Sequence, residues 1–369
     1  MLDESIYRLR ITQVQKQMSD TDMDFALLTP APNFQYLAGY SYQMRERLVA
    51  LLIRKGFEPE LIVPAFEESD HSSHTWIKEM IPWEEDENPY TMLCEMVGKQ
   101  GADSTVLLDE SLPLGVYWAL EKAFGQFKKV LSITPTLNSL RIVKSEDEVA
   151  LMRKAGHIID EAVMKSFKDA QIGMTELQVS QMVRSEIIRQ GAAPTFATVQ
   201  FGRNSALPHT DSSTRDLRKG DVLLMDCGCS FDGYNTDMTR VGVVGEPTEE
   251  IEQVYSVVRK AEETAIEKIS RGMVCGSADG IARRVIEEAG YSDYFTHRLG
   301  HGIGLEVHEP PYLVRGNAQE LSVGMCHSVE PGIYLEGQFG IRIEDLVYIR
   351  EDRLEVLTYS PKDLIILDL

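Results

Sequence analysis

The sequence predicts two domains of different class, an α/β domain over residues 1–135 and an α+β domain over residues 140–369. Three observations support this division. A chain of 369 residues is too long for one ordinary hydrophobic core. The first part alternates short apolar runs with helical patterns, as α/β domains do. The second part carries two helix pairs, each followed by strand-like segments.

In the first domain the apolar runs are short and bounded by turn residues, so they predict strands. These runs are residues 24–30, 48–55, 60–66 and 104–110. Helical spacing of apolar residues predicts helices over 4–18 and 114–124. We find no catalytic constellation in this part of the sequence, which places the expected chemistry in the second domain.

The second domain follows a break at residues 132–144 and begins with a capped helix. Ser145 and Glu148 have the spacing of a capping box, in which each side chain satisfies the other residue's backbone donor. Thr175 and Gln178 repeat this spacing at a second helix, for which Gly191 is the expected stop. A further helix pair is expected over 248–270 and 277–290.

The helix pairs precede acidic residues at matching intervals. Asp226 lies 81 residues after Ser145, and Glu330 lies 81 residues after Glu249. This spacing indicates a duplication into two helix-helix-strand halves, each supplying a pair of carboxylates.

Composition excludes several classes of partner. A net charge of −21 argues against a nucleic acid, whose phosphates require clustered Lys and Arg. No apolar run reaches the length of about 18 residues that crosses a membrane, and the amino terminus has no apolar signal region. Five scattered cysteines fit a reducing cytoplasm better than a disulfide framework. We therefore expect a cytoplasmic protein that binds neither nucleic acid nor membrane.

The segment LLMDCGCSFDGYNTDMTR predicts a hairpin with Asp232-Gly233 as its loop. Counting outward from that loop places Gly228 opposite Asp237. Asp226 then projects to the same face as Asp237, and Gly228 leaves room between them. Two close carboxylates repel each other unless a cation compensates, and the flanking apolar residues indicate a buried strand. The alternative is that the two aspartates lie on a solvated outward face. A loop of three residues instead of two would also place Asp226 and Asp237 on opposite faces of the hairpin.

A second hairpin is expected in HSVEPGIYLEGQFGIRIEDLVYI. Glu330 and Glu344 are equidistant from Gly337, so they fall opposite each other across an odd-numbered loop. A Glu-Glu pair is unfavourable without a cation. With His301, the two carboxylate pairs make five ligands rich in oxygen, which suit two divalent ions such as Mn, Co, Fe or Zn. Cys227 and Cys229 point away from this face, and we interpret them as core residues.

The segments NSALPH, MDCGCSFDGYNTDMTR, HRLGHGIGLEVHEPP, SVEPGIY and GIRIEDLV together resemble the pita-bread metallopeptidases, and within them the Xaa-Pro dipeptidases (prolidases) and aminopeptidase P. The resemblance covers residues 140–369 well. The first 135 residues are similar in kind to the α/β domain that prolidase, aminopeptidase P and creatinase share. The fold it implies for the second domain is a curved antiparallel sheet backed by two helix pairs.

The resemblance also implies a ligand role for each metal-site residue. Asp226 would bind one ion, Asp237 and Glu344 would bridge both, and His301 and Glu330 would bind the second. Two divalent ions are implied, with manganese expected and cobalt, zinc or iron as alternatives. Because all five ligands are present, the chain does not resemble the metal-free creatinase branch.

Roles in catalysis and substrate binding follow from the same resemblance. Glu330 would be the general base. His308 would donate to the carbonyl oxygen as negative charge develops, and His209 would contact substrate near the peptide nitrogen or on the side of the leaving residue. Structural imidazoles are the alternative for both histidines. Arg342 would orient Glu344 or reach substrate, with a surface arginine as the equal alternative.

One departure from the prolidase pattern concerns the arginine that anchors the dipeptide carboxylate. Tyr312 stands at the closest position, and Arg315 follows three residues later as the candidate anchor. Strict dipeptide specificity is therefore open.

Three functions compete. The leading one is hydrolysis of the Xaa-Pro bond in a dipeptide or short peptide, by a dipeptidase or by aminopeptidase P. The second is creatinase-like hydrolysis of a non-peptide C–N bond. The third is a non-catalytic binding module, which retention of all five ligands disfavours. A homodimer is expected from the resemblance.

Overall fold

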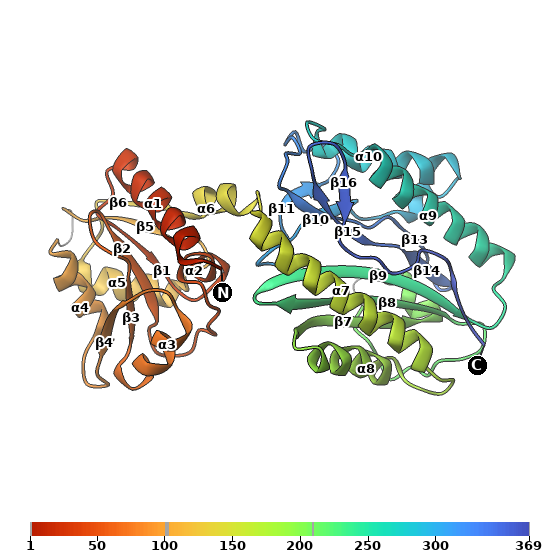
Figure 1. Ribbon diagram of the computed structural model, residues 1–369, viewed down its shortest axis with the longest axis horizontal. Helices are drawn as coiled ribbons and strands as arrows, with labels where there is room; N and C mark the ends of the chain where they lie inside the picture. The colour runs from red at the N-terminus through yellow and green to blue at the C-terminus, as the bar shows by residue number, and fades with distance from the viewer. Residues whose placement is uncertain (1, 100–102, 209, 369) are drawn as a thin grey trace. The chain divides into compact units, whose positions relative to one another are not determined.

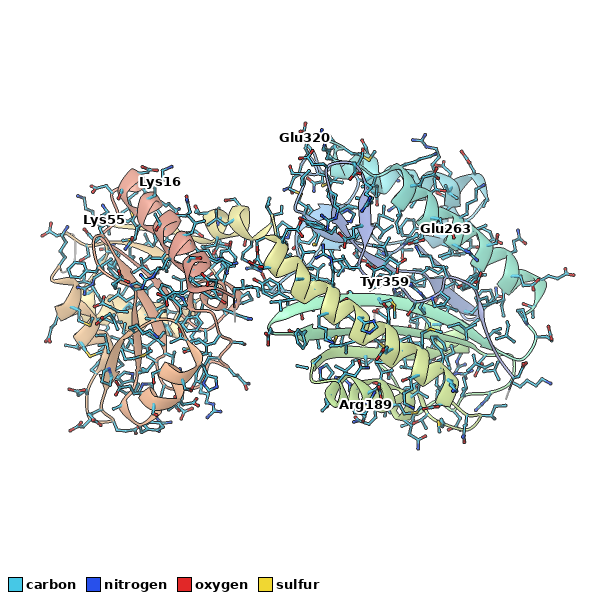
Figure 2. All side chains as sticks on the ribbon, in the orientation of Figure 1. Lys16, Lys55, Arg189, Glu263, Glu320 and Tyr359 are labelled. Atoms are coloured by element: carbon cyan, nitrogen blue, oxygen red, sulfur yellow. The ribbon has the colours of Figure 1, made fainter. Side chains whose placement is uncertain are left out.

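The computed structural model describes residues 2–99, 103–208 and 210–368. The chain divides into two compact units, Met1–Arg141 and Ile142–Leu369. Figure 1 shows the elements of each unit. Charged side chains such as Lys16, Lys55 and Glu263 project from the surfaces of the units (Figure 2), so part of the acidic and basic composition is solvated surface. No helix in the described ranges combines the length and the hydropathy that a membrane crossing requires.

The first unit is an α/β domain, as predicted, built on a six-stranded mixed sheet of order β4-β3-β2-β1-β5-β6. Its strands are β1 (Phe25–Leu28), β2 (Ala50–Arg54), β3 (Glu60–Pro64), β4 (Glu79–Trp83), β5 (Thr105–Leu108) and β6 (Lys129–Ser132). Its helices are α1 (Glu4–Thr21), α2 (Pro32–Ala38), α3 (Glu68–His74), α4 (Pro89–Val97), α5 (Leu114–Phe124) and α6 (Thr134–Arg141), with a 3-10 turn η1 (Ala65–Glu67).

The sequence pattern missed the two edge strands of this sheet. Strands β4 and β6 are largely half-buried or exposed, so they lack the apolar runs that identified the four inner strands. Helix α6 occupies most of the segment that we expected to be a break.

The second unit contains the two predicted helix pairs, α7 (Glu146–Asp169) with α8 (Glu176–Arg189), and α9 (Glu249–Lys268) with α10 (Cys275–Glu288). Both capping boxes are confirmed. Ser145 accepts from the Glu148 backbone N–H while Glu148 accepts from that of Ser145, and Thr175 and Gln178 do the same. Gly191 follows α8 with a φ of 81°, a conformation that favours glycine at a helix end.

Helices α7 and α8 pack against a four-stranded sheet of order β17-β9-β8-β7. Its strands are β7 (Ala193–Phe201), β8 (Val222–Phe231), β9 (Tyr234–Val244) and β17 (Ile365–Leu367). All pairs are antiparallel except β17 with β9, which is parallel. Cys227 and Cys229 lie in the core beneath these helices, which confirms their interpretation as core residues.

Helices α9 and α10 pack against the remaining strands. One sheet has the order β11-β10-β12-β15-β16, and β13 and β14 form a separate hairpin. The strands are β10 (Gly300–Gly302), β11 (Glu309–Leu313), β12 (Cys326–Val329), β13 (Gly332–Leu335), β14 (Phe339–Arg342), β15 (Asp345–Ile349) and β16 (Leu354–Val356), and the 3-10 turns are η3 (Gly202–Ala206) and η4 (Ser292–Tyr294). A bridge between Thr239 and Glu344 joins β9 to the start of β15.

The β8–β9 hairpin has the predicted register, with Phe231 opposite Tyr234 and Gly228 opposite Asp237. Asp232 and Gly233 form its loop with φ values of 47° and 88°. Both values are positive, as a two-residue turn that matches the strand twist requires.

The β13–β14 hairpin also has the predicted centre. Gly332 pairs with Arg342 and Leu335 pairs with Phe339, so Gly337 is the middle of the loop. Continuing this register by two residues places Glu330 opposite Glu344. Pairing extends in that direction, because the Ile343 N–H donates to the Pro331 carbonyl at 3.4 Å.

Candidate metal centre

The five predicted ligands come from five segments of the second unit. Asp226 lies on β8, Asp237 on β9 and His301 on β10, while Glu330 follows β12 and Glu344 precedes β15. The structure brings them together. Ligand atoms of Asp226, Asp237 and Glu344 lie within 4.8 Å of one another, as do those of His301, Glu330 and Glu344. A third group joins Asp237 and His301 to His308.

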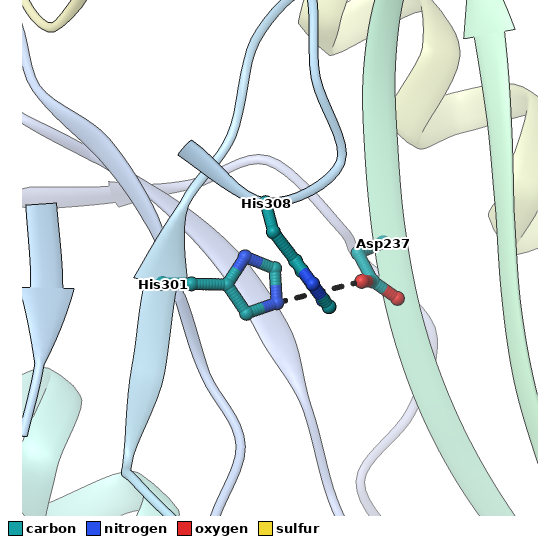
Figure 3. A group of neighbouring side chains, drawn as sticks. All are labelled: Asp237, His301 and His308. Carbon is teal, nitrogen blue, oxygen red and sulfur yellow. Dashed lines mark ion pairs between the residues drawn. The ribbon is translucent and has the colours of Figure 1, made fainter. Parts of the chain in front are cut away.

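His301 presents its Nε2 atom to the carboxylates. Its Nδ1 lies 3.1 Å from the Gly302 carbonyl, so Nδ1 carries the hydrogen and donates it. Nε2 lies 3.3 Å from Glu330 Oε1. It also lies 3.8 Å from Asp237 Oδ2, the contact that the dashed line marks in Figure 3. Burial, with a smaller contribution from His308, lowers the pKa of His301 to about 3. The ring is therefore neutral, which is the form that binds a metal.

Among the described residues, the positive charge of Arg342 only partly compensates the four carboxylates of the cluster. Burial and the neighbouring Glu344 raise the pKa of Asp237 well above its usual range, and burial and Glu330 do the same for Glu344. Burial raises the pKa of Glu330 to about 7. Carboxyl groups held this close and this dry cannot all ionise without a cation.

Two buried oxygens supply a direct test of whether these residues fit metal ions. Asp237 Oδ1 and Glu344 Oε1 have no hydrogen-bond partner among the described residues. Buried polar atoms are almost always paired, so unpaired oxygens on residues of a carboxylate cluster indicate a bound cation. An oxygen-rich set with one neutral imidazole is the donor set of Mn, Co, Fe or Zn. The residues therefore fit divalent cations.

Arg342 is the principal cation of the cluster, and the surface alternative for this residue is wrong. Its side chain is buried and donates from Nη2 to Asp226 Oδ2 at 2.5 Å. Nη1 donates to the Tyr334 hydroxyl at 2.8 Å and Nε to the Thr239 hydroxyl at 3.1 Å. Arg342 thus orients Asp226 directly and reaches Glu344 through Thr239.

The cluster opens into a cavity of about 580 Å³. The five predicted ligands, His308 and Arg342 all line it. Phe196, Pro208 and Val307 add an apolar wall, and His297 and Arg298 add a polar one. This combination of an apolar wall with a few converging polar groups is typical of a small-molecule site.

The ring of Phe196 explains why residue 228 is glycine. A Cβ at Gly228 would lie 2.4 Å from the Phe196 ring. The space that we expected between the two aspartates is therefore occupied by this ring, which reaches the cavity across β8.

Three predicted substrate or catalytic residues have different surroundings. His308 is exposed at the cavity, with its ring centroid 4.0 Å from that of His301 (Figure 3). His209 lies outside the described residues. Arg315 is exposed in a turn and is not among the described residues that line the cavity.

Sequence reasoning missed Thr239, Tyr334 and Arg298. The register of the β8–β9 hairpin would have found Thr239, because it pairs directly with Asp226. The register of the β13–β14 hairpin would likewise have found Tyr334, because pairing Gly332 with Arg342 places Tyr334 diagonally opposite Arg342 on the same face. Arg298 carries no such signal, since it precedes β10 and its partner Tyr312 lies on β11.

A largely buried cluster of four carboxylates and a neutral imidazole in a cavity is the site of a metalloenzyme. Residues 150–351 match the model of metallopeptidase family M24, and residues 10–143 match the creatinase/prolidase N-terminal domain. The chain belongs to metallopeptidase family M24.

Similar proteins match the chain over both units. An Xaa-Pro dipeptidase of Lactobacillus delbrueckii subsp. lactis is 32% identical over 364 residues, which cover 97% of this chain and 99% of that protein. The crystal structure of a prolidase from Thermococcus sibiricus has a TM-score of 0.92 at 34% identity and covers 100% of both chains. An X-Pro aminopeptidase from Thermotoga maritima MSB8 has a TM-score of 0.85 at 30% identity and covers 95% of this chain and 100% of that one.

Proposed function

We propose that this chain is an Xaa-Pro dipeptidase that uses two divalent ions. The observation that carries the proposal is the convergence of all five ligands in one cavity, where two buried carboxylate oxygens have no hydrogen-bond partner among the residues that the structure describes. The names of similar proteins, Xaa-Pro dipeptidase and prolidase, support the substrate class.

The ligand assignment we propose divides the five residues between two ions. Asp226 would hold one ion, His301 and Glu330 the other, and Asp237 and Glu344 would contact both. When bound, the ions supply Lewis-acid polarisation of the scissile carbonyl and lower the pKa of a water molecule that they hold. Manganese is the proposed metal, because oxygen donors dominate the set.

The chain's own residues would carry the proton and stabilise developing charge. Glu330 takes the proton of the attacking water on its carboxylate and passes it to the departing proline nitrogen. His308 is exposed at the cavity, so its ring can donate to the carbonyl oxygen as that oxygen becomes negative. His209 would contact the substrate on the side of the leaving residue.

The cation that we propose for the substrate carboxylate is Arg298 instead of Arg315. Arg298 lines the cavity, and its guanidinium lies 4.7 Å from the ring centroid of Tyr312. Stacking on an aromatic face holds the guanidinium plane without using its hydrogen-bond donors. Tyr312, at the position where some prolidases have arginine, would thus orient an arginine from the segment that precedes β10. Arg342 is committed to Asp226, which leaves it the role of a positioning residue for the metal ligands.

Two further properties belong to the proposal. A cytoplasmic location is supported by the five cysteines, all of which are free and buried. A homodimer is the proposed assembly, as it is the commonest form of soluble oligomer.

The test compares Ala-Pro with Ala-Pro-Ala after manganese loading, with a chelator-treated sample as control. Cleavage of Ala-Pro alone supports the dipeptidase. Cleavage of the tripeptide replaces it with an aminopeptidase P activity, and the Thermotoga relative is named X-Pro aminopeptidase. If neither peptide is cut by protein that holds two ions, the peptidase proposal is wrong and the creatinase-like C–N hydrolysis is the next to test.

The residue assignment has its own test in two variants. Glu330→Gln keeps the size of the side chain but removes the proposed base, so we expect kcat to fall by about 100-fold or more. Arg315→Ala is the matched control, and we expect no change with it, because Arg315 is exposed away from the cavity lining.

A further inference from the structure

The carboxylate of Glu344, a residue of the metal site, accepts a hydrogen bond from a hydroxyl group on β9. Thr239 donates its hydroxyl hydrogen to Glu344 Oε2 at 2.7 Å. The same hydroxyl oxygen accepts from Arg342 Nε at 3.1 Å. Both Thr239 and Glu344 are buried, so water does not compete for these bonds.

The direction of these two bonds follows from chemistry. A guanidinium can only donate, so the hydroxyl oxygen is the acceptor from Arg342. The hydroxyl hydrogen is then available for Glu344 alone, and it fixes which carboxylate oxygen faces β9. Oε2 is used by Thr239, whereas Oε1 is buried with no partner in the described part of the chain.

The backbone restricts Glu344 at the same point. The Glu344 N–H donates to the Thr239 carbonyl at 3.2 Å, and Arg240 Nη1 donates to the Glu344 carbonyl at 2.7 Å. With the main chain fixed on both sides, the remaining freedom of Glu344 lies in its side-chain torsions. The hydroxyl of Thr239 restricts these torsions by holding the carboxylate end of the side chain.

A second hydroxyl has the same arrangement at Glu330. Ser328 accepts from the His301 backbone N–H at 3.0 Å and donates to Glu330 Oε1 at 3.0 Å. Each of the two glutamates among the five predicted ligands therefore accepts a hydrogen bond from a hydroxyl, and that hydroxyl itself accepts a hydrogen bond from an N–H group. This repetition points to a positioning role.

We propose that Thr239 is a positioning residue for the metal centre, whose hydroxyl turns Glu344 so that Oε1 is presented to the ions. This inference rests on the proposed ligand role of Glu344. Hydrogen bonds that orient metal ligands typically change metal affinity by about 10–100-fold when they are removed. The consequence is therefore measurable as metal binding, independently of peptide cleavage.

The experiment uses the full chain after chelator treatment and titrates it with Mn²⁺ in a calorimeter. Thr239→Val removes the hydroxyl with little change of shape, Thr239→Ala removes it with loss of volume, and Thr239→Ser retains it. Thr236→Val is the matched control, because Thr236 is a buried threonine of the same strand whose hydroxyl has no partner among the described residues. The melting temperature of each metal-free variant checks that it is folded.

We expect Thr239→Val and Thr239→Ala to bind at least one Mn²⁺ about tenfold or more weakly, with Thr239→Ser close to the wild type and Thr236→Val unchanged. The Mn²⁺ concentration that gives half-maximal activity should rise by the same factor. Wild-type affinity in whichever of the Val and Ala variants folds would overturn the proposal. So would a serine variant as weak as the valine variant, or an equal loss in Thr236→Val.

These outcomes separate the inference from the proposed function. If the wild type binds two Mn²⁺ ions but cleaves neither Ala-Pro nor Ala-Pro-Ala, the substrate proposal fails while the calorimetry still decides the role of Thr239. If the wild type binds no divalent ion, the positioning role is overturned together with the ligand assignment.

Discussion

The buried ion pair between Lys144 and Glu309, the residue after His308, allows the most quantitative prediction. Lys144 Nζ lies 2.6 Å from Glu309 Oε1, and the two side chains are 1% and 4% exposed. Glu309 directly follows His308, and its other oxygen accepts the Glu306 N–H at 3.4 Å. The pair packs on Gly304, where a Cβ would lie 2.7 Å from Glu309 Oε1.

The perturbation is Lys144→Met, which leaves the Glu309 carboxylate buried without its lysine. Removing one partner of a buried pair costs about 3–5 kcal/mol, whereas replacing both partners by apolar residues is often close to neutral. We therefore expect Lys144→Met to lower the free energy of unfolding by about 3–5 kcal/mol. The double variant Lys144→Met/Glu309→Met should be at least about 2 kcal/mol more stable than the single one. Because His308 is adjacent to the pair, kcat/KM should fall in the single variant.

The assay is urea unfolding followed by two signals. All three tryptophans, Trp76, Trp83 and Trp118, lie in the first unit, so their fluorescence reports on that unit. Far-UV circular dichroism follows both units, and a shift in it without a matching shift in fluorescence locates the loss in the second unit. A single variant that loses less than about 1 kcal/mol, or a double variant as unstable as the single one, would refute the reasoning.

Three further predictions follow. His71 is buried with Nδ1 2.7 Å from the Tyr40 hydroxyl, and burial lowers its pKa, so its contribution to the free energy of unfolding should be present above a pH of about 6.5, the unfolded-state pKa, and lost as the pH falls below that value. Urea unfolding at pH 5 and 7.5, followed by tryptophan fluorescence, should therefore show a smaller pH dependence of stability in His71→Gln than in the wild type. An unchanged pH dependence would contradict this. Gly228→Ala places a Cβ 2.4 Å from the Phe196 ring, so it should lower the free energy of unfolding by about 1–3 kcal/mol and alter KM. Thermal unfolding and peptide kinetics measure the two effects, and a variant of wild-type stability would show that the ring moves freely. Arg298→Ala should raise KM for Ala-Pro by about tenfold but leave Ala-Pro amide unaffected, and an equal effect on both would exclude a role for Arg298 at the carboxylate.

Local patterns determined much of the second unit. The capping boxes at Ser145 and Thr175 depend only on residues three apart, and both were predictable. The Asp232-Gly233 turn and the symmetric position of Gly337 set the two hairpin registers, because a hairpin's register follows from its loop. Those registers were sufficient to pair the carboxylates of each hairpin.

The edge strands of the first unit show the limit of such patterns. Strands β4 and β6 are not fully buried, so neither needs a continuous apolar run. Their pairing with β3 and β5 supplies the backbone hydrogen bonds that stabilise them. Pairing with a distant segment leaves no local signal in the sequence.

What the sequence alone determined about this protein is its two-domain class, its helix pairs and the five residues expected to form a metal site. Only the tertiary structure showed that the two carboxylate pairs face each other, that Arg342 is buried against Asp226, and that Thr239 meets Glu344. It also showed that Arg298 lines the cavity and that Arg315 lies exposed in a turn. Turns and helix caps depend on residues a few positions apart, so the sequence pattern reveals them. The contacts of Arg342 with Asp226 and of Thr239 with Glu344 join segments about 100 residues apart, and only the packing of the sheets fixes their geometry.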